Sequence, residues 1–370
     1  MDARAQPPLT PGLMNAGDVT EALLAWYRAH ARVLPWRAPP GAPRMEAYRV
    51  WLSEVMLQQT TVAAVIPYFQ KFTERWPTVQ ALAAAPSEDV MAAWAGLGYY
   101  SRARRLVECA GVVAALGDFP PDEAGLRALP GLGAYTAAAV AAIAFGARAV
   151  VVDGNVERVV SRLFAIDTPL PAARGEIREG ADRLTPADHP GDFAQAMMDL
   201  GATACTPRSP KCLICPVAPW CAARGSGAPE TYPVKPPKVA KPARKGTAWW
   251  IERDGAQGRE VWLVRREGKG LLGGMRALPD DGWVARKDGT GIPPFAAAWR
   301  PVGAVAHVFT HFSLALSVQA INLSSLKNMG PRAMGEGEWW PVARLDDAGL
   351  PTVFARAAAR AMAVFETEPE

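Results

Sequence analysis

The chain has 370 residues, half of them hydrophobic, and its 40 Lys and Arg against 36 Asp and Glu give a formal net charge of +4. This length is too great for one ordinary core and predicts two domains, while the 34 Pro and 33 Gly follow no period, which excludes collagen-like and repeat architectures. The sequence does not open on a basic and then apolar signal, and charged residues interrupt its apolar stretches. We therefore expect neither secretion nor a membrane span, but a cytoplasmic protein.

Residues 1–17 are rich in Pro, Gly and Ala and are expected to form a flexible tail. Over residues 18–223 apolar residues recur three and four positions apart, and Pro or Gly separates most of these stretches, which predicts an all-α domain. The expected helices cover 19–31, 47–57, 61–73, 87–95, 101–116, 122–129, 134–145, 154–164, 174–183 and 192–202.

The second expected helix carries a carboxylate among apolar side chains. Glu54 lies between Trp51, Leu52, Val55 and Met56. Burial disfavours the charged form of a carboxyl group, so we expect Glu54 to have a raised pKa, as a general acid needs. The alternative is a glutamate on a solvated face of the helix.

The segment Gly96-Leu97-Gly98-Tyr99-Tyr100 follows the fourth expected helix. Its two glycines allow a loop that approaches a ligand closely. One interpretation of Tyr99 is an aromatic side chain that fills the core, and a role as a contact residue follows only from the family resemblance given below.

A second glycine-containing turn, Leu129-Pro130-Gly131-Leu132-Gly133, lies between two expected helices. Glycines permit a sharp hairpin, and the helix that follows begins with unpaired backbone N–H groups, which suit a phosphate. By itself, this pattern of Pro and Gly indicates only a common turn. Its position between two expected helices is a more specific indication of a hairpin that binds a phosphate.

A further polar turn, Asp153-Gly154-Asn155, precedes the expected helix 154–164. An isolated Asp-Gly is more often a turn than a catalytic group. The surrounding Val152-Asp153-Gly154-Asn155-Val156-x-Arg158-Val159 makes Asp153 a candidate carboxylate, which polar and helix N-terminal donors would keep ionised.

Four of the five cysteines fall at Cys205, Cys212, Cys215 and Cys221. In a reducing compartment such a group indicates a metal or an iron–sulfur cluster rather than disulfides. Zinc sites usually pair two close knuckles across a longer gap, whereas only one pair is close here and no histidine is near, so the spacing favours iron–sulfur. Cys109 lies in an Ala- and Val-rich segment and is expected to be a buried hydrophobic residue.

Residues 224–246 contain five prolines and six basic residues against one Glu and predict an extended basic linker, either a spacer or an additional DNA-phosphate contact. Over residues 247–370 short β-like runs at 248–251, 261–264 and 314–318 precede an expected helix at 352–365. This second domain is predicted to be α+β.

The hairpin between two helices, the segment 152–159 and the four-cysteine loop together resemble the endonuclease III superfamily of helix–hairpin–helix base-excision glycosylases, over about residues 30–221. The resemblance implies that the four cysteines hold a 4Fe–4S cluster. Four thiolates leave such a cluster no open ligand position, which favours a structural role.

Within this superfamily, the segment Leu52–Thr60 resembles the signature of adenine DNA glycosylases of the MutY type. Bifunctional glycosylase–lyases carry a nucleophilic lysine just after the hairpin. This sequence has Tyr135 there, which implies a monofunctional, hydrolytic enzyme.

The second domain resembles the Nudix-like, 8-oxoguanine-reading domain of the same family in the segments 271–275 and 307–311. It carries no Arg-Glu-x-x-Glu-Glu box, so pyrophosphate hydrolysis is not expected. The family loop usually ends Phe-Ser-His, whereas this chain has Phe309-Thr310-His311, and the strand 275–279 also departs from the family pattern. The alternative interpretation of this strand is an ordinary β-hairpin in the domain core.

The resemblance implies removal of adenine mispaired with 8-oxoguanine or G in double-stranded DNA. Glu54 would protonate N7 of the flipped adenine, and Asp153, beside Asn155 and Tyr135, would stabilise or capture the cationic sugar. The residues it implies as DNA or base contacts are Gln59, Thr60, Leu97, Tyr99, Gly131, Gly133, Arg32, Leu34, Trp36, Arg37, Leu57, Gln195, Phe309, Thr310 and His311. The insertion-like stretch 38–43 would alter one wall of the base pocket.

Two other functions stay open: an endonuclease III-like glycosylase–lyase, and a non-catalytic DNA-binding iron–sulfur protein. The first lacks its hairpin lysine, and the second has no need of both Glu54 and Asp153. A monomer suffices for the scheme, and no membrane partner is expected; on DNA the protein would be nucleoid-associated.

Overall fold

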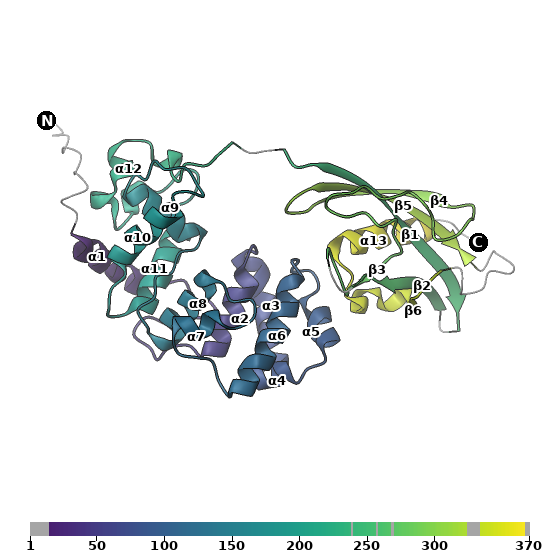
Figure 1. Ribbon diagram of the computed structural model, residues 1–370, viewed down its shortest axis with the longest axis horizontal. Helices are drawn as coiled ribbons and strands as arrows, with labels where there is room; N and C mark the ends of the chain where they lie inside the picture. Colours follow the sequence, from purple (N-terminus) through teal and green to yellow (C-terminus); the bar gives the residue numbers. More distant parts are fainter. Residues whose placement is uncertain (1–14, 238–239, 257, 268–269, 324–333, 367–370) are drawn as a thin grey trace. The chain divides into compact units, whose positions relative to one another are not determined.

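The computed structural model describes residues 15–237, 240–256, 258–267, 270–323 and 334–366 (Figure 1). The chain divides into two compact units, each built from two stretches of sequence. Met1–Ala84 and Arg105–Lys238 form what we call the helical unit, and Ala85–Arg104 with Val239–Glu370 form the sheet unit. The expected tail, residues 1–17, lies mostly outside the described residues, although residues 16 and 17 begin the first helix.

The expected all-α architecture is confirmed over the first part of the chain. Its helices are α1 (Ala16–His30), α2 (Ala47–Leu57), α3 (Val62–Arg75), α4 (Val79–Ala83), α5 (Ser87–Trp94), α6 (Ser101–Leu116), α7 (Glu123–Arg127), α8 (Ala134–Val140), α9 (Gly154–Leu163), α10 (Arg174–Leu184) and α11 (Pro190–Thr203). Short α4 was not expected; it begins because the Thr78 side chain accepts the Ala81 N–H at 3.1 Å. The expected helix 134–145 is α only to Val140, because residues 141–145 form a π turn ended by Gly146 at φ +70°.

Helix α11 lies at the centre of the helical unit and packs against α1, α9 and the π turn. Two glycines allow these close approaches. A Cβ on Gly191 would lie 2.5 Å from the Ala142 carbonyl oxygen, and one on Gly201 would lie 2.5 Å from Cβ of Asn155. Close packing therefore brings the start of α9 against α11, and with it the Asp153 turn.

The four-cysteine segment follows α11 as a tightly wound loop with the 3-10 turns η2 (Cys212–Ile214) and η3 (Ala218–Trp220), then α12 (Ala222–Gly225). The expected linker 224–246 is not extended throughout: η4 (Pro229–Thr231) lies within it, and the first strand begins at Ala243. The Leu170 N–H donates to the Val234 carbonyl at 2.9 Å, which ties part of this segment to the helical unit.

The sheet unit is a mixed sheet of β1 (Ala243–Gly255), β2 (Gly258–Arg265), β3 (Arg276–Ala277), β4 (Arg300–Val308), β5 (Ser313–Asn322) and β6 (Glu338–Pro341). The strand order is β3-β2-β1-β5-β4, and β6 also pairs with β2. Strands β1 and β5 are parallel and the other pairs antiparallel, with the tight turn Gly255↔Gly258 joining β1 to β2. The expected α+β class and the three expected strands are confirmed.

Helix α13 (Thr352–Glu366) packs against β4, β5 and β1 and covers one face of the sheet (Figure 1). Trp250, Leu316 and Phe354 belong to the core on that face, and Trp249, Ile251 and Trp262 to a smaller core on the other. The alternation of these residues along β1 follows from the two-residue period of a strand.

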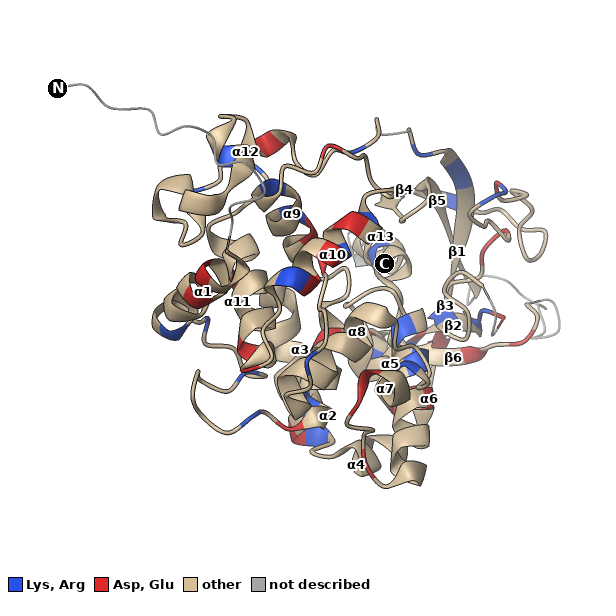
Figure 2. Cartoon of the chain, turned by 60° about the vertical axis from the view of Figure 1, so that its left-hand side comes forward, with Lys and Arg blue, Asp and Glu red and all other residues tan. Residues whose placement is uncertain are grey.

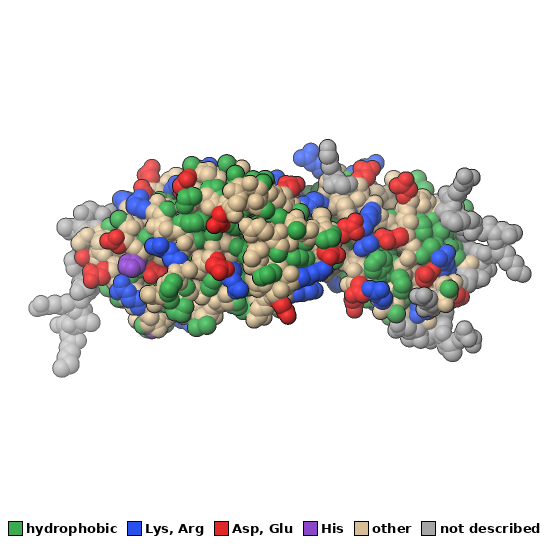
Figure 3. Space-filling view, turned by 90° about the horizontal axis from the view of Figure 1, so that it is seen from below, with side chains coloured by type: hydrophobic (Ala, Val, Ile, Leu, Met, Phe, Trp, Pro, Cys, Tyr) green, Lys and Arg blue, Asp and Glu red, His purple; other side chains and the backbone are tan. Residues whose placement is uncertain are grey.

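Charged residues of both signs are distributed along the chain (Figure 2) and interspersed on the face seen in Figure 3, in keeping with a net charge of only +4. On the face seen in Figure 3, the charges alone therefore do not mark a DNA-binding surface. Among the described residues, no helix is long and apolar enough to cross a membrane.

Candidate active site

Glu54 lies in the middle of α2 and is 5% exposed. Burial raises its pKa to about 7, the Asp153 charge adds to the rise, and the Tyr135 hydrogen bond and the Arg37 charge oppose it. The expected burial and raised pKa are both present. Near neutral pH a substantial fraction of this carboxyl group carries a proton that it could donate.

Tyr135, in the first turn of α8, donates its hydroxyl hydrogen to Oε2 of Glu54 at 2.5 Å. Burial and the neighbouring Glu54 raise the pKa of Tyr135 well above its ordinary value. The phenol therefore keeps its proton, and it orients the Glu54 carboxyl group. The hairpin tyrosine thus contacts the candidate acid directly.

Asp153 is the N-cap of α9. Its Oδ1 accepts the backbone N–H groups of Asn155 at 2.9 Å and Val156 at 2.7 Å, and its Oδ2 accepts the Asn155 side-chain amide at 2.9 Å. Three donors from one turn fix the orientation of the carboxylate. The negative charge of Asp153 contributes to the raised pKa of Glu54.

Arg158 continues this network to the cysteine loop, a role that the sequence did not reveal. Its guanidinium donates to Oδ1 of Asn155 at 2.8 Å, to the Gly201 carbonyl at 2.7 Å and to the Cys205 carbonyl at 2.7 Å. Asp153 is therefore joined to the first cysteine through Asn155 and Arg158.

The four clustered cysteines form no disulfide and line one small cavity together with Arg162 and Pro210. In the described part of the chain, no three His, Cys, Asp or Glu side chains are grouped so as to hold a single metal ion. A 4Fe–4S cubane is held by four cysteine thiolates, one on each iron, and the four cysteines that line this cavity supply that set of ligands.

Arg162 is a second residue near the cysteines that the sequence did not single out. Its guanidinium is 1% exposed and donates to Sγ of Cys205 at 3.3 Å and to the carbonyls of Thr206, Pro207 and Tyr232. Its acceptors all belong to the cysteine loop or the chain just after it. Arg162 therefore braces that loop against α9.

Two of the residues expected around a flipped base, Arg32 and Arg37, belong to an ion cluster. Asp199 of α11 is fully buried and pairs with Arg32 at 2.6 Å and Arg37 at 2.7 Å. Trp36 is buried with its ring against Phe69, at 5.2 Å between centroids. Sequence reasoning missed Asp199, because its partners lie more than 160 residues away.

Gln195 lies one turn before Asp199 and is buried, with its amide donating to the Gly191 carbonyl at 3.3 Å. It lines a cavity of about 260 Å³ together with the insertion-like stretch 38–43, Arg44 and Ile143. The stretch that was expected to alter one wall of the base pocket thus shares a cavity with Gln195.

Two of the expected DNA contacts have left-handed backbones: Gln59 at φ +57° and Tyr99 at φ +50°. Such conformations cost non-glycine residues of order 1–3 kcal/mol and concentrate at functional sites. Both residues are exposed, whereas Leu97 is buried, so Leu97 is more suited to support its loop than to contact DNA. Thr60 donates its hydroxyl to the Gln58 carbonyl at 3.3 Å in the same turn as Gln59.

The hairpin glycines lie where the sequence expects them, between α7 and α8. Gly131 has φ +80°, and a Cβ there would lie 2.9 Å from the Arg105 side chain. Gly133 is exposed and is the N-cap of α8, with no side chain to cap the first turn. The backbone N–H groups of this turn are therefore suited to a phosphate.

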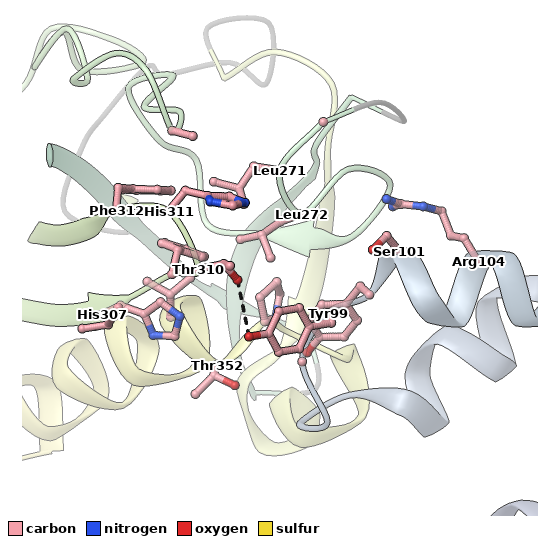
Figure 4. A pocket seen from close by; sticks show the side chains of 18 residues that line it. Tyr99, Ser101, Arg104, Leu271, Leu272, His307, Thr310, His311, Phe312 and Thr352 are labelled. Atoms are coloured by element: carbon pink, nitrogen blue, oxygen red, sulfur yellow. Dashed lines mark hydrogen bonds between the residues drawn. The ribbon is translucent and has the colours of Figure 1, made fainter. Parts of the chain in front are cut away.

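The sheet unit brings Tyr99 and the 309–312 turn, which joins β4 to β5, into one cavity of about 400 Å³ (Figure 4). The Thr310 hydroxyl lies 3.4 Å from the Tyr99 hydroxyl, in hydrogen-bonding contact. Phe309 stacks on Phe312 with centroids 4.6 Å apart, and His311 and Leu272 line the same cavity. Two candidate groups distant in sequence thus share one pocket.

Three family models match the chain. Residues 52–183 match the HhH-GPD superfamily of base excision DNA repair proteins, residues 205–221 the iron-sulfur binding domain of endonuclease III, and residues 247–360 the NUDIX domain. They confirm the expected fold classes of both domains and the expected 4Fe–4S cluster.

Two adenine DNA glycosylases are similar to this chain over most of its length. The chain is 39% identical over 363 residues to the adenine DNA glycosylase of Homo sapiens, covering 82% of this chain and 66% of the human one. It is 43% identical over 265 residues to that of Mycobacterium tuberculosis, covering 70% and 81%. Among solved structures, a thermostable thymine-DNA glycosylase matches with TM-score 0.51 and 28% identity, over 57% of this chain and 97% of that one.

Proposed function

Since the chain belongs to the adenine DNA glycosylases, a family of monofunctional base-excision repair enzymes, we propose that it hydrolyses the N-glycosidic bond of adenine mispaired with 8-oxoguanine or G in double-stranded DNA. The observation that carries this proposal is the pairing of a buried, protonatable Glu54 with Tyr135 beside a capped Asp153.

The adenine must leave the base stack before any group can reach it. Gln59 and Tyr99 are exposed on strained turns, where they can enter the space that the base leaves. The backbone N–H groups after Gly133 bind a phosphate and so fix the position of the duplex.

In the pocket, the neutral carboxyl group of Glu54 donates its proton to N7 of adenine, which makes the base a viable leaving group. The Tyr135 hydroxyl holds that carboxyl group in place. As the glycosidic bond breaks, C1′ of the sugar becomes cationic, and the Asp153 carboxylate stabilises or captures it. Water then attacks C1′ and its proton returns to the Glu54 carboxylate, which restores the acid and completes the hydrolysis.

The cysteine loop acts structurally in this scheme. The cluster, when bound to Cys205, Cys212, Cys215 and Cys221, supplies a cross-link for a loop that lacks a core of its own. Arg162 and Arg158 connect that loop to α9, and thereby to Asp153 and Asn155.

The sheet unit recognises 8-oxoguanine through the pocket of Tyr99, Phe309, Thr310 and His311. The Thr310 and Tyr99 hydroxyls can donate to or accept from the polar edge of an oxidised guanine. Thr310 keeps the hydroxyl expected of this loop, so its added methyl group does not remove the polar contact.

The test is single-turnover base release from duplexes that carry A opposite 8-oxoguanine, A opposite G, A opposite T, or thymine glycol opposite A. We expect the fastest adenine release opposite 8-oxoguanine, slower release opposite G and none opposite T. Cleavage at thymine glycol, or a borohydride-trapped enzyme–DNA adduct in high yield, would instead identify a glycosylase–lyase. Tight binding with no base released would identify a DNA-binding protein without catalytic activity.

A further inference from the structure

Asp199 is a fully buried carboxylate with two cationic partners. Its oxygens accept the backbone N–H of Arg32 at 3.1 Å, the Arg32 Nε at 2.6 Å, and Nη1 of Arg37 at 2.8 and 2.7 Å. Burial of a carboxylate is costly unless hydrogen-bonded cations compensate it, and here two cations share one anion. The cluster therefore has a net positive charge.

Both arginines come from the segment that follows α1, in which the structure has no helix or strand over residues 31–46. Arg37 is held locally by one backbone hydrogen bond, from its N–H to the Leu34 carbonyl at 3.0 Å. A long side chain on such a segment has many rotamers. Asp199, on the rigid central helix α11, is the group that restricts Arg37 to one of them.

Arg37 in turn acts on the catalytic pair. Its charge lowers the pKa of Glu54 and also that of Tyr135. The other charge that shifts the pKa of Glu54 is that of Asp153. In the described residues, only Nη1 of Arg37 has a hydrogen-bond acceptor, which leaves the rest of the guanidinium available to a bound base.

We propose that Asp199 is a positioning residue of the reaction: its hydrogen bonds to Nη1 fix the guanidinium of Arg37 in the place where it meets the flipped base. This inference rests on the proposed function. The titratable and charged groups around the cluster are Tyr27 of α1, Glu54 of α2, Tyr135 of α8, Asp153 at the start of α9, Asp192 of α11, and Arg32 and Arg37.

Asp199→Asn removes the charge that anchors Arg37 and keeps the shape of the side chain. We expect roughly 10- to 100-fold slower single-turnover adenine release at the pH optimum, since misplaced catalytic groups cost about that much. Because Arg37 then no longer lowers the pKa of Glu54, the pH at which the rate falls by half moves upward. Arg37→Gln should slow adenine release to a similar extent and move the pH midpoint of the rate upward in the same way.

The decisive measurement is a double-mutant cycle of D199N and R37Q in the full-length, cluster-loaded protein, with rates measured across pH on the 8-oxoguanine:A duplex. If Asp199 acts through Arg37, the rate of adenine release falls no further in the double variant than in the slower single variant. The pH midpoint of the rate should then move upward by the same amount in all three variants. Losses that multiply, or a slow D199N with an unmoved pH midpoint, would overturn the inference. If the wild type released no adenine, the proposed function itself would fail.

Asp182→Asn is the matched control, since it breaks the exposed pair that Asp182 forms with Arg148 at 2.7 Å. It should leave rate and pH midpoint unchanged. Melting and the visible absorbance of the cluster report folding. Asp199→Glu keeps the charge and should retain the wild-type pH midpoint of adenine release, with a smaller loss of rate than D199N. If D199N does not fold, D199E takes its place in the test. A pH midpoint of D199E shifted as far as that of R37Q would contradict the role of the Asp199 charge.

Discussion

In the helical unit Glu54 and Tyr135 lie on helices and share a hydrogen bond, and Asp153 caps a third helix, whereas in the sheet unit the candidate lesion contacts lie on loops around a cavity. Glu54 is buried, and the Tyr135 hydroxyl holds its carboxyl group through a hydrogen bond. Asp153 is held as the N-cap of α9. Tyr99 and Thr310 are exposed and share one contact of 3.4 Å.

The two regions therefore suit different steps of the reaction. Rigid, buried groups suit the bond-breaking step, because a catalytic group must be in place before the transition state forms. Exposed loop residues suit recognition, in which each contact adds a modest free energy. We therefore expect large effects of substitution in the first region and small ones in the second.

The largest effect should come from Glu54→Gln. The amide keeps the size of the side chain but cannot donate the proton, so we expect adenine release to slow by about 10²–10⁴-fold in single-turnover assays on 8-oxoguanine:A duplexes. Glu74→Gln, the same change at an exposed position of α3, is the control and should leave the rate unchanged. A rate within threefold of wild type for E54Q would remove Glu54 from the mechanism.

Asp153→Asn should come next, at about 10²–10³-fold, since it removes the negative charge that faces the cationic sugar. Asparagine is as good an N-cap as aspartate, so α9 should remain folded and the melting temperature should change little. A slow enzyme with an unchanged melting temperature would place the effect in the chemical step. A variant that only melts earlier, with normal release by the folded fraction, would assign Asp153 a structural role.

A smaller effect is expected of Asn155→Ala, which removes the amide between Asp153 and Arg158. Loss of one hydrogen bond to a charged group costs about 1.5–3 kcal/mol, or roughly 10- to 150-fold in rate if it is felt fully in the transition state. The same assay, run beside cluster absorbance, checks it. Loss of the cluster with no change in the rate of the loaded fraction would count against coupling between loop and carboxylate.

The smallest effect should be that of Thr310→Ala in the sheet unit. Removing one neutral hydroxyl contact should reduce the preference for 8-oxoguanine over G by about 2- to 10-fold and leave release opposite G unchanged. Thr310→Ser keeps the hydroxyl and is the matched control. Equal losses opposite 8-oxoguanine and G would show that Thr310 does not read the lesion.

The same contrast explains what the sequence could predict. Local patterns indicated the α2 helix around Glu54, the hairpin, the Asp153 cap and the cysteine loop, because each lies within a few consecutive residues. The Asp199 pairing with Arg32 and Arg37 spans more than 160 residues and leaves no local signal. The grouping of 85–104 with the sheet unit likewise depends on tertiary contacts, such as that of Arg104 with the Gly273 carbonyl.

Two local departures have local causes. The π turn at 141–145 allows α11 to approach at Gly191, a contact that helix periodicity does not encode. The strand β1 begins at Ala243, inside a stretch whose prolines and lysines predicted a linker, because pairing with β5 extends to Ala243↔Ser313.

The most direct test of the account is the pH dependence of single-turnover adenine release by the wild-type protein. Glu54 must be protonated to act, so the rate should be constant below its pKa and fall about tenfold per pH unit above it, with a midpoint near the pKa of about 7. The residual rate of E54Q should lack this step. A wild-type profile without a fall above neutral pH, or the same fall in E54Q, would contradict the assignment of Glu54 as the general acid.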